Sequence, residues 1–102
     1  MKKKKRGNTT DGCIYGYPIS EVWNTYHYLA KLIVPRLKAF KALDKYGYCP
    51  AFAGIKAWNN AIQKMIDAFE LLANNSSFSE EEKQTIDEGL ELFCKHFRNL
   101  WD

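Results

Sequence analysis

Apolar side chains recur every three or four positions along residues 20–41, the spacing of one face of an α-helix. The series comprises Val22, Tyr26, Leu29, Ile33, Leu37 and Phe40. Ser20 stands just before it as a good N-cap residue, and Glu21 suits the positive end of the helix dipole. We therefore predict a helix that begins at Ser20 and turns this apolar series toward the core.

Pro35 falls inside this pattern. Its ring removes one helical hydrogen bond and clashes with the carbonyl of Lys31, so it kinks or ends a helix. Because the apolar register continues in phase on both sides of Pro35, the pattern favours one helix kinked at the proline. The alternative is a break at Val34, with Pro35 as the first residue of a second helix.

Two further helical patterns follow. The second runs from about Gly54 to Ala73, and its apolar residues are Ile55, Trp58, Ile62, Met65, Ile66, Phe69 and Leu72. The third begins at Ser79, which forms a capping box with Glu82. Its apolar seam has heptad-like steps and consists of Ile86, Leu90, Phe93, Phe97 and Leu100. No segment alternates with a period of two for long enough to predict a strand, so we expect an all-α, three-helix, up-down-up bundle.

The chain has 102 residues and a mass of 11.9 kDa, which suits one domain. No run approaches the roughly 18 apolar residues that a membrane-spanning helix needs. The basic N-terminus is not followed by the apolar stretch of a secretory signal. We predict that residues 1–18 form a flexible basic arm with a tyrosine-rich loop, and that residues 19–102 form a single helical domain.

Charge divides the chain into two halves of opposite sign. Residues 1–50 hold ten Lys and Arg against three acids, whereas residues 51–102 hold five against nine. The basic half contains the run Lys2–Arg6 and a set of lysines at helical spacing, namely Lys31, Lys38, Lys41 and Lys45. We expect these lysines to form one basic ridge. This ridge is either simply a solvated helix face or a binding surface. Its partner would then be a nucleic acid, a nucleotide or the acidic third helix of a neighbouring subunit.

Arg36 lies at the edge of the predicted apolar face. An arginine in that position must be paired or must face a pocket. One interpretation is a structural ion pair whose acidic partner is Asp67, Glu70 or Glu91. The other is that its guanidinium binds an anionic ligand with two parallel hydrogen bonds.

Aromatic residues supply candidate stacking and interface positions. Tyr15-Gly-Tyr17 and Tyr46-Gly-Tyr48 have the same local composition, and each is closely followed by a proline. Tyrosines beside cations suit a nucleotide site, although they also pack over the end of a small bundle. Trp23, Leu92 and Trp101 fall outside or at the margin of the helical seams, so we expect them to form an apolar contact between subunits.

Catalytic and metal chemistry have little support in the sequence. The cysteines Cys13, Cys49 and Cys94 form no close pair, and His27 and His96 lie on different segments. We therefore expect free thiols, no metal site and no cofactor. The serines near residue 77 have no nearby base, and the helical pattern puts His96 on the polar shoulder of the third helix. We predict a protein that is not an enzyme.

Three sequence blocks together resemble a group of small helical proteins of uncharacterised function that tailed bacteriophages encode. The first is Pro35-Arg-Leu-Lys-Ala-Phe-Lys41, the second Lys64-Met-Ile-Asp-Ala-Phe-Glu-Leu71, and the third Glu88-Gly-Leu-Glu-Leu-Phe-Cys-Lys-His-Phe-Arg-Asn-Leu-Trp-Asp102. The likeness covers roughly residues 20–102 and omits the basic arm. It implies a phage accessory protein that acts in the cytoplasm of a bacterial host.

Small phage accessory proteins commonly act by binding, which gives three functional hypotheses of different kinds. The leading one is a non-catalytic oligomer that sequesters an anionic nucleotide, such as a cyclic nucleotide immune signal. Its site would comprise Arg36, Lys31, Lys38, Lys41, Tyr15, Tyr17, Tyr46 and Tyr48. The second is a module that binds and inhibits a host or phage protein. The third is nonspecific nucleic-acid binding through Lys2–Arg6, which would depend steeply on salt.

Overall fold

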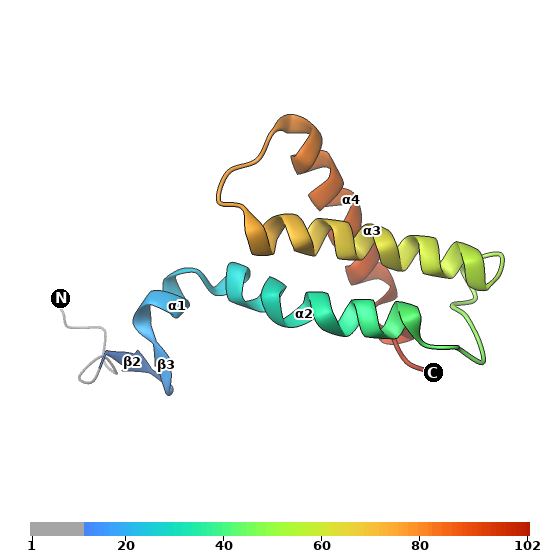
Figure 1. Cartoon of the computed structure of the whole chain (residues 1–102), viewed down its shortest axis with the longest axis horizontal. Coiled ribbons are helices and arrows are strands. Elements are labelled where there is room, and N and C mark those ends of the chain that lie inside the picture. Colours follow the sequence, from blue (N-terminus) through green and yellow to red (C-terminus); the bar gives the residue numbers. More distant parts are fainter. Residues whose placement is uncertain (1–11) are drawn as a thin grey trace.

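The computed structural model describes residues 12–102, which form two short strands and four α-helices (Figure 1). The elements in chain order are β2 (Cys13–Ile14), β3 (Tyr17–Pro18), α1 (Ile19–Trp23), α2 (Thr25–Ala42), α3 (Ile55–Asn74), α4 (Glu80–His96) and the 3-10 turn η1 (Phe97–Asn99). The prediction of a mainly helical protein is confirmed. Residues 1–11 of the predicted basic arm, including the run Lys2–Arg6, lie outside the described residues.

The strands β2 and β3 form an antiparallel hairpin in which Ile14 pairs with Tyr17. Tyr15 and Gly16 make the turn with φ values of 50° and 84°. Two successive positive φ angles are typical of the tight turns whose twist suits a hairpin, and glycine adopts such angles without strain. The expectation of no strand was wrong here, because two-residue strands are too short to produce a visible alternation.

The first predicted helix is divided into α1 and α2 at Asn24, whose backbone has φ −117° and ψ 40°. The helix begins at Ile19, and Pro18 rather than Ser20 occupies the N-cap position. Beyond Asn24 the prediction of one helix that passes through Pro35 is confirmed, because α2 continues through the proline without a break at Val34. The uninterrupted apolar register therefore indicated correctly that the helix passes through the proline.

The long helix α3 is the centre of the molecule, and α2 and α4 both pack against it. Within residues 12–102, α2 and α4 are not in contact with each other, so the three long helices do not close into the expected bundle. Figure 1 shows α2 running alongside α3 while α4 crosses it. The fully buried large side chains all belong to α3 and are Trp58, Ile62, Met65 and Ile66.

Among the long helices, α2 and α4 each pack only against α3 in the described chain. Each of them therefore buries a narrower face than the sequence pattern predicts. On α2, Leu37 is buried and Ile33 and Phe40 are half-buried, but Tyr26 and Leu29 are exposed. The predicted seam of α4 changes in the same way, since Ile86 is buried whereas Leu90 and Phe97 are exposed. A third helix closing over these positions would have covered them.

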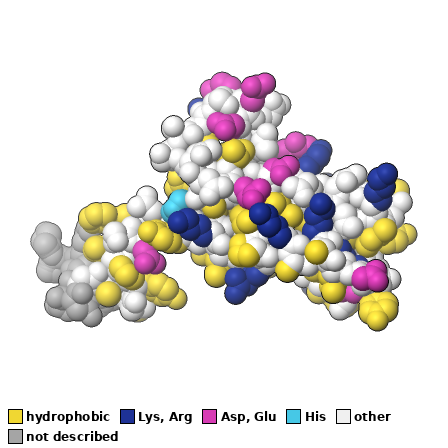
Figure 2. Space-filling view, viewed as in Figure 1, with side chains coloured by type: hydrophobic (Ala, Val, Ile, Leu, Met, Phe, Trp, Pro, Cys, Tyr) yellow, Lys and Arg dark blue, Asp and Glu magenta, His cyan; other side chains and the backbone are white. Residues whose placement is uncertain are grey.

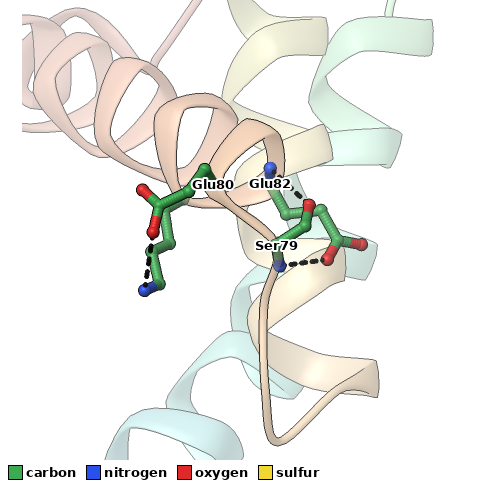
Figure 3. A network of polar contacts seen from close by, with 4 residues as sticks. Ser79, Glu80 and Glu82 are labelled. Carbon is green, nitrogen blue, oxygen red and sulfur yellow. Dashed lines mark hydrogen bonds and ion pairs between the residues drawn. The ribbon is translucent and has the colours of Figure 1, made fainter.

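The helix α4 begins with the predicted capping box (Figure 3). The amide of Glu82 donates to the Ser79 hydroxyl at 3.1 Å, and the amide of Ser79 donates to the Glu82 carboxylate at 2.9 Å. Two amides that would otherwise lack helical acceptors are thereby satisfied. This capped end fixes where α4 begins.

Residues 12–23, which we call the N-terminal arm, extend away from the three long helices (Figure 1). Among the described elements, β2, β3 and α1 contact one another, and α1 alone of these also contacts α2. The molecule accordingly measures 54 × 32 × 19 Å and is elongated. No helix within the described part of the chain is both long and apolar enough to cross a membrane.

Candidate functional site

The tyrosines predicted to share a site lie at opposite ends of α2. Tyr15 and Tyr17 belong to the hairpin of the N-terminal arm, whereas Tyr46 and Tyr48 follow the C-terminal end of α2. A helix of 18 residues is about 27 Å long at 1.5 Å per residue. The fold of one chain therefore does not bring the two pairs together.

Arg36 lies exposed near the middle of α2, and its Nη1 donates to the carbonyl oxygen of Leu32 in the preceding turn at 3.0 Å. Glu70, one of the acids expected to pair with it, instead binds Lys38 at 2.7 Å. Asp67, a second candidate, accepts a hydrogen bond from Gln63. Within the described chain, the guanidinium of Arg36 is therefore directed to solvent rather than to a structural ion pair.

The predicted lysine ridge is not one continuous solvated surface. Lys31 and Lys38 are exposed, but Lys41 and Lys45 are half-buried. Lys45 donates to the carbonyl oxygens of Lys41 and Leu43 and lies 5.2 Å from the centre of the Phe40 ring. Its burial lowers its pKa, against the opposing attraction of Asp102 and Asp44, while Lys41 adds to the lowering. The lysines therefore divide into an exposed pair and a pair at the end of the helix.

A cavity of about 430 Å³ lies near that end, between the segment that follows α2 and the last residues of the chain. We call it the end pocket, and its lining residues are Tyr46, Gly47, Tyr48, Cys49, Pro50, Trp58, Asn99, Trp101 and Asp102. The carboxylate of Asp102 accepts hydrogen bonds from the amides of Tyr46, at 3.0 Å and 3.1 Å, and of Gly47, at 3.2 Å. These bonds hold the two sides of the pocket together.

The end pocket has aromatic walls and an aromatic floor. Tyr46 is 100% exposed and Trp101 is 74% exposed, so both rings are accessible at the rim. The floor includes Trp58, which is buried and packs against Phe52 at a ring distance of 5.3 Å. Such rings offer flat apolar faces on which a planar group or an apolar side chain can pack.

Cys49, which lines the end pocket, forms a buried pair with His96 that the sequence did not reveal. Cys49 and His96 are 4% and 7% exposed, and the Cys49 Sγ lies 3.6 Å from the His96 Nδ1. The rings of Phe52 and Trp58 lie 5.0 Å and 6.2 Å from the His96 ring. The placement of His96 on a polar shoulder was wrong, because the imidazole fills the space between the α4 end and the 46–50 segment.

No spacing rule could have connected Cys49 with His96, since they are 47 positions apart, with Cys49 between α2 and α3 and His96 at the end of α4. A cysteine that is buried among aromatic rings behaves mainly as a small apolar side chain, and reactive cysteines are usually more exposed. Among residues 12–102, no three His, Cys, Asp or Glu side chains lie close enough to hold a metal ion. The pair is part of the packed wall of the end pocket.

The sequence pattern also missed a second apolar stripe on α2, which we call the outer face. It consists of Leu29, Leu32, Arg36 and Ala39 of α2, at the steps of three and four that characterise a helix-pairing seam, together with Leu43, which follows the last turn of α2 in an extended conformation. All five residues are exposed, and the three leucines are 51%, 53% and 49% exposed. Figure 2 shows hydrophobic side chains at the surface over the arm and over the helical part of the molecule.

The three predicted interface residues do not form one surface. Trp23 is exposed at the end of α1, and Trp101 is exposed at the end pocket. Leu92 is half-buried on α4 and packs against the core. The two tryptophans are separated by the length of α2, so a contact in which both take part must extend along that helix.

Comparisons of the chain with protein-family models, with curated proteins and with solved structures each found no match. Function is therefore inferred from two features of the molecule. One is the exposed outer face of α2, and the other is the end pocket with its aromatic rim.

Proposed function

We propose that this protein is a non-catalytic interaction protein that binds another protein chain through the outer face of α2. The observation that carries this proposal is the exposed series Leu29, Leu32, Arg36 and Ala39, which has the spacing of a helix-pairing seam, with the half-exposed Leu43 directly after the helix. Single exposed apolar residues are common, but a stripe along a helix indicates a surface that another molecule covers. Burying such side chains yields roughly 25 cal/mol per Å² of apolar area.

The chemistry of the outer face also suits a protein contact. Arg36 is the one charged residue in the stripe, and arginine is enriched at the centres of protein interfaces. Pro35 and Ala39 are exposed beside it, and small or compact side chains allow a second backbone to approach closely. The likeness to phage proteins extends the proposal to a role in which the bound protein belongs to the phage or to its bacterial host.

The proposal is tested by site-specific photo-crosslinking in cells that express the full chain. A photoreactive amino acid at Leu32 is expected to produce a discrete crosslinked species. Leu90 on α4 is the matched control, because it is also an exposed leucine but lies on a different helix. If Leu32 gives no discrete product, or if Leu90 gives the same product with equal yield, the outer face is not a protein-binding surface.

A second candidate function is binding of an anionic nucleotide at the end pocket, including a cyclic nucleotide immune signal whose sequestration would counter host defence. The accessible rings of Tyr46, Tyr48 and Trp101 favour it, because bases stack on aromatic side chains. The volume of about 430 Å³ lies within the range of roughly 300–1,000 Å³ of small-molecule sites. Among the described residues, Asp102 is the only charged one that lines the pocket, and Lys45, outside the lining, is close enough for its charge to interact with this carboxylate.

Calorimetric titration with a panel of cyclic and linear nucleotides tests this second candidate. Binding is expected to be lost in Trp101→Ala and retained in Trp23→Ala, which removes an exposed tryptophan at the other end of α2. The absence of heat for every nucleotide at high protein concentration contradicts it. Equal loss in the two variants would also exclude the end pocket as the site.

A further inference from the structure

The accessible aromatic side chains are concentrated at both ends of α2. At one end, the arm presents Tyr15 at 87% and Tyr17 at 64% exposure. At the other end, the rim of the end pocket presents Tyr46 and Tyr48. The outer face connects the two ends, so an apolar surface extends along the whole helix and beyond it.

We propose that the occupant of the outer face is a second copy of this chain, whose α2 lies antiparallel to the first. In this pair the N-terminal arm of each copy covers the end pocket of the other. The inference rests on the proposed function and names the partner. A second copy fits because an antiparallel pair places the start of one α2 beside the end of the other, so that the two exposed aromatic groups meet.

The side chains of the outer face fit a helix of the same sequence. If Leu32 faces the partner's Arg36, then Leu29 faces the partner's Ala39 by the same register. The large Leu29 then opposes the small Ala39, and the aliphatic stem of Arg36 covers Leu32. Both arrangements favour close packing. The guanidinium can remain at the edge of the contact, since it is exposed in the single chain.

Other charges do not oppose this pairing. Lys38 reaches Glu70 of α3 at 2.7 Å, so its side chain is directed away from the outer face. Lys31 lies seven positions earlier and therefore on the same side of α2 as Lys38. A parallel pair would instead bring the two Arg36 residues face to face. It would also place the two arms together at one end of the pair and the two end pockets together at the other end. The antiparallel direction avoids this repulsion.

The end pocket has an exposed rim at Tyr46 and Trp101 in the single chain, and in the proposed pair the partner covers this rim. In the register above, the arm residues just before α2 lie beside the partner's segment 46–50. The four tyrosines that α2 separates would then meet across the two copies. An aromatic side chain buries about 150–250 Å², so these four, of which Tyr17 and Tyr48 are already partly buried, can supply a large part of the roughly 800 Å² that each partner buries in a stable interface.

Sedimentation equilibrium of the full chain tests the inference. The expected mass is twice 11.9 kDa. Leu32→Glu is expected to give a monomer with unchanged helical circular dichroism, whereas Leu90→Glu remains a dimer. A monomeric wild-type chain at high concentration, or a trimer or larger assembly, overturns the proposal. If the chain is monomeric while Leu32 crosslinks to a different protein, the proposed function stands and only the second copy is wrong.

Disulfide trapping tests the direction of the pair. In a Cys13→Ser/Cys94→Ser background, the variant that carries both Leu29→Cys and Ala39→Cys is expected to form a covalent dimer under mild oxidation. Leu29→Cys alone is expected to form little, because the two copies of residue 29 lie far apart in an antiparallel pair. Efficient crosslinking of Leu29→Cys alone would show a parallel pair and contradict the proposal.

Discussion

At the scale of single residues, Gly89 determines how closely α3 and α4 approach. A Cβ atom at this position would lie 2.5 Å from the carbonyl oxygen of Lys64 and would overlap the Cβ of Ala68. Both contacts are with rigid parts of α3, so the helices would have to move apart. The crossing in Figure 1 therefore depends on a residue without a side chain.

Gly89→Ala is expected to lower the free energy of unfolding by about 2 kcal/mol. Overpacking costs roughly 1–3 kcal/mol or more where backbone must shift, which outweighs the gain of about 1 kcal/mol from replacing glycine within a helix. Urea denaturation followed by circular dichroism measures the change. Gln84→Ala, at an exposed position of α4, is the control and should change stability little. A more stable Gly89→Ala chain would show that the helices are not in this contact.

The buried Cys49–His96 pair leads to a second prediction at this scale. Iodoacetamide is expected to alkylate the exposed Cys94 much faster than Cys49 in the folded chain, since Cys49 is only 4% exposed and packs against His96. Mass spectrometry of peptides from a time course measures both rates. In denaturant the two cysteines should react at similar rates. Comparable rates in the folded chain would contradict the packing of the 46–50 segment against α4.

At the scale of elements, each helix boundary reflects chemistry within one or two turns. The Ser79–Glu82 box and the continuous register through Pro35 could be predicted from the sequence, because both depend on neighbouring residues. The break at Asn24 could not be predicted. There the Asn24 and Thr25 side chains donate to the carbonyl oxygens of Ser20 and Val22. Such side-chain bonds compete with helical ones, and nothing in the apolar spacing reveals them.

Ser79→Ala is expected to reduce the free energy of unfolding by about 1 kcal/mol, because it removes the acceptor for the Glu82 amide. Equilibrium urea denaturation again measures the change. Ser77→Ala, two residues before the cap and outside the helix, is the matched control. If the two substitutions had equal effects, the cap would not be stabilising α4.

At the scale of the whole molecule, the elongated form follows from the position of the arm. The radius of gyration is 17.1 Å, against about 13 Å for a compact chain of this length. The arm contributes to this length while contacting α2 alone among the long helices described. The core around α3 is therefore independent of residues 12–23.

Deletion of residues 1–23 is expected to leave α2, α3 and α4 folded. The truncated chain should retain its helical circular dichroism and unfold cooperatively, because the buried residues lie between Ala30 and His96. Thermal unfolding of both forms measures this. A truncated chain without a cooperative transition would show that the arm is required for the core.

The sequence by itself determined the helical segments, the capped start of α4 and the continuity of α2 through Pro35. These features depend on backbone sterics and hydrogen bonds among residues a few positions apart. Tertiary structure alone decided that α3 is central, that His96 is buried beside Cys49, and that Leu29 and Leu32 are exposed. Periodicity gives the direction of a side chain on its own helix, but burial depends on which other element covers that direction. Because α2 and α4 do not meet in the described chain, one apolar face of α2 remains available for a partner.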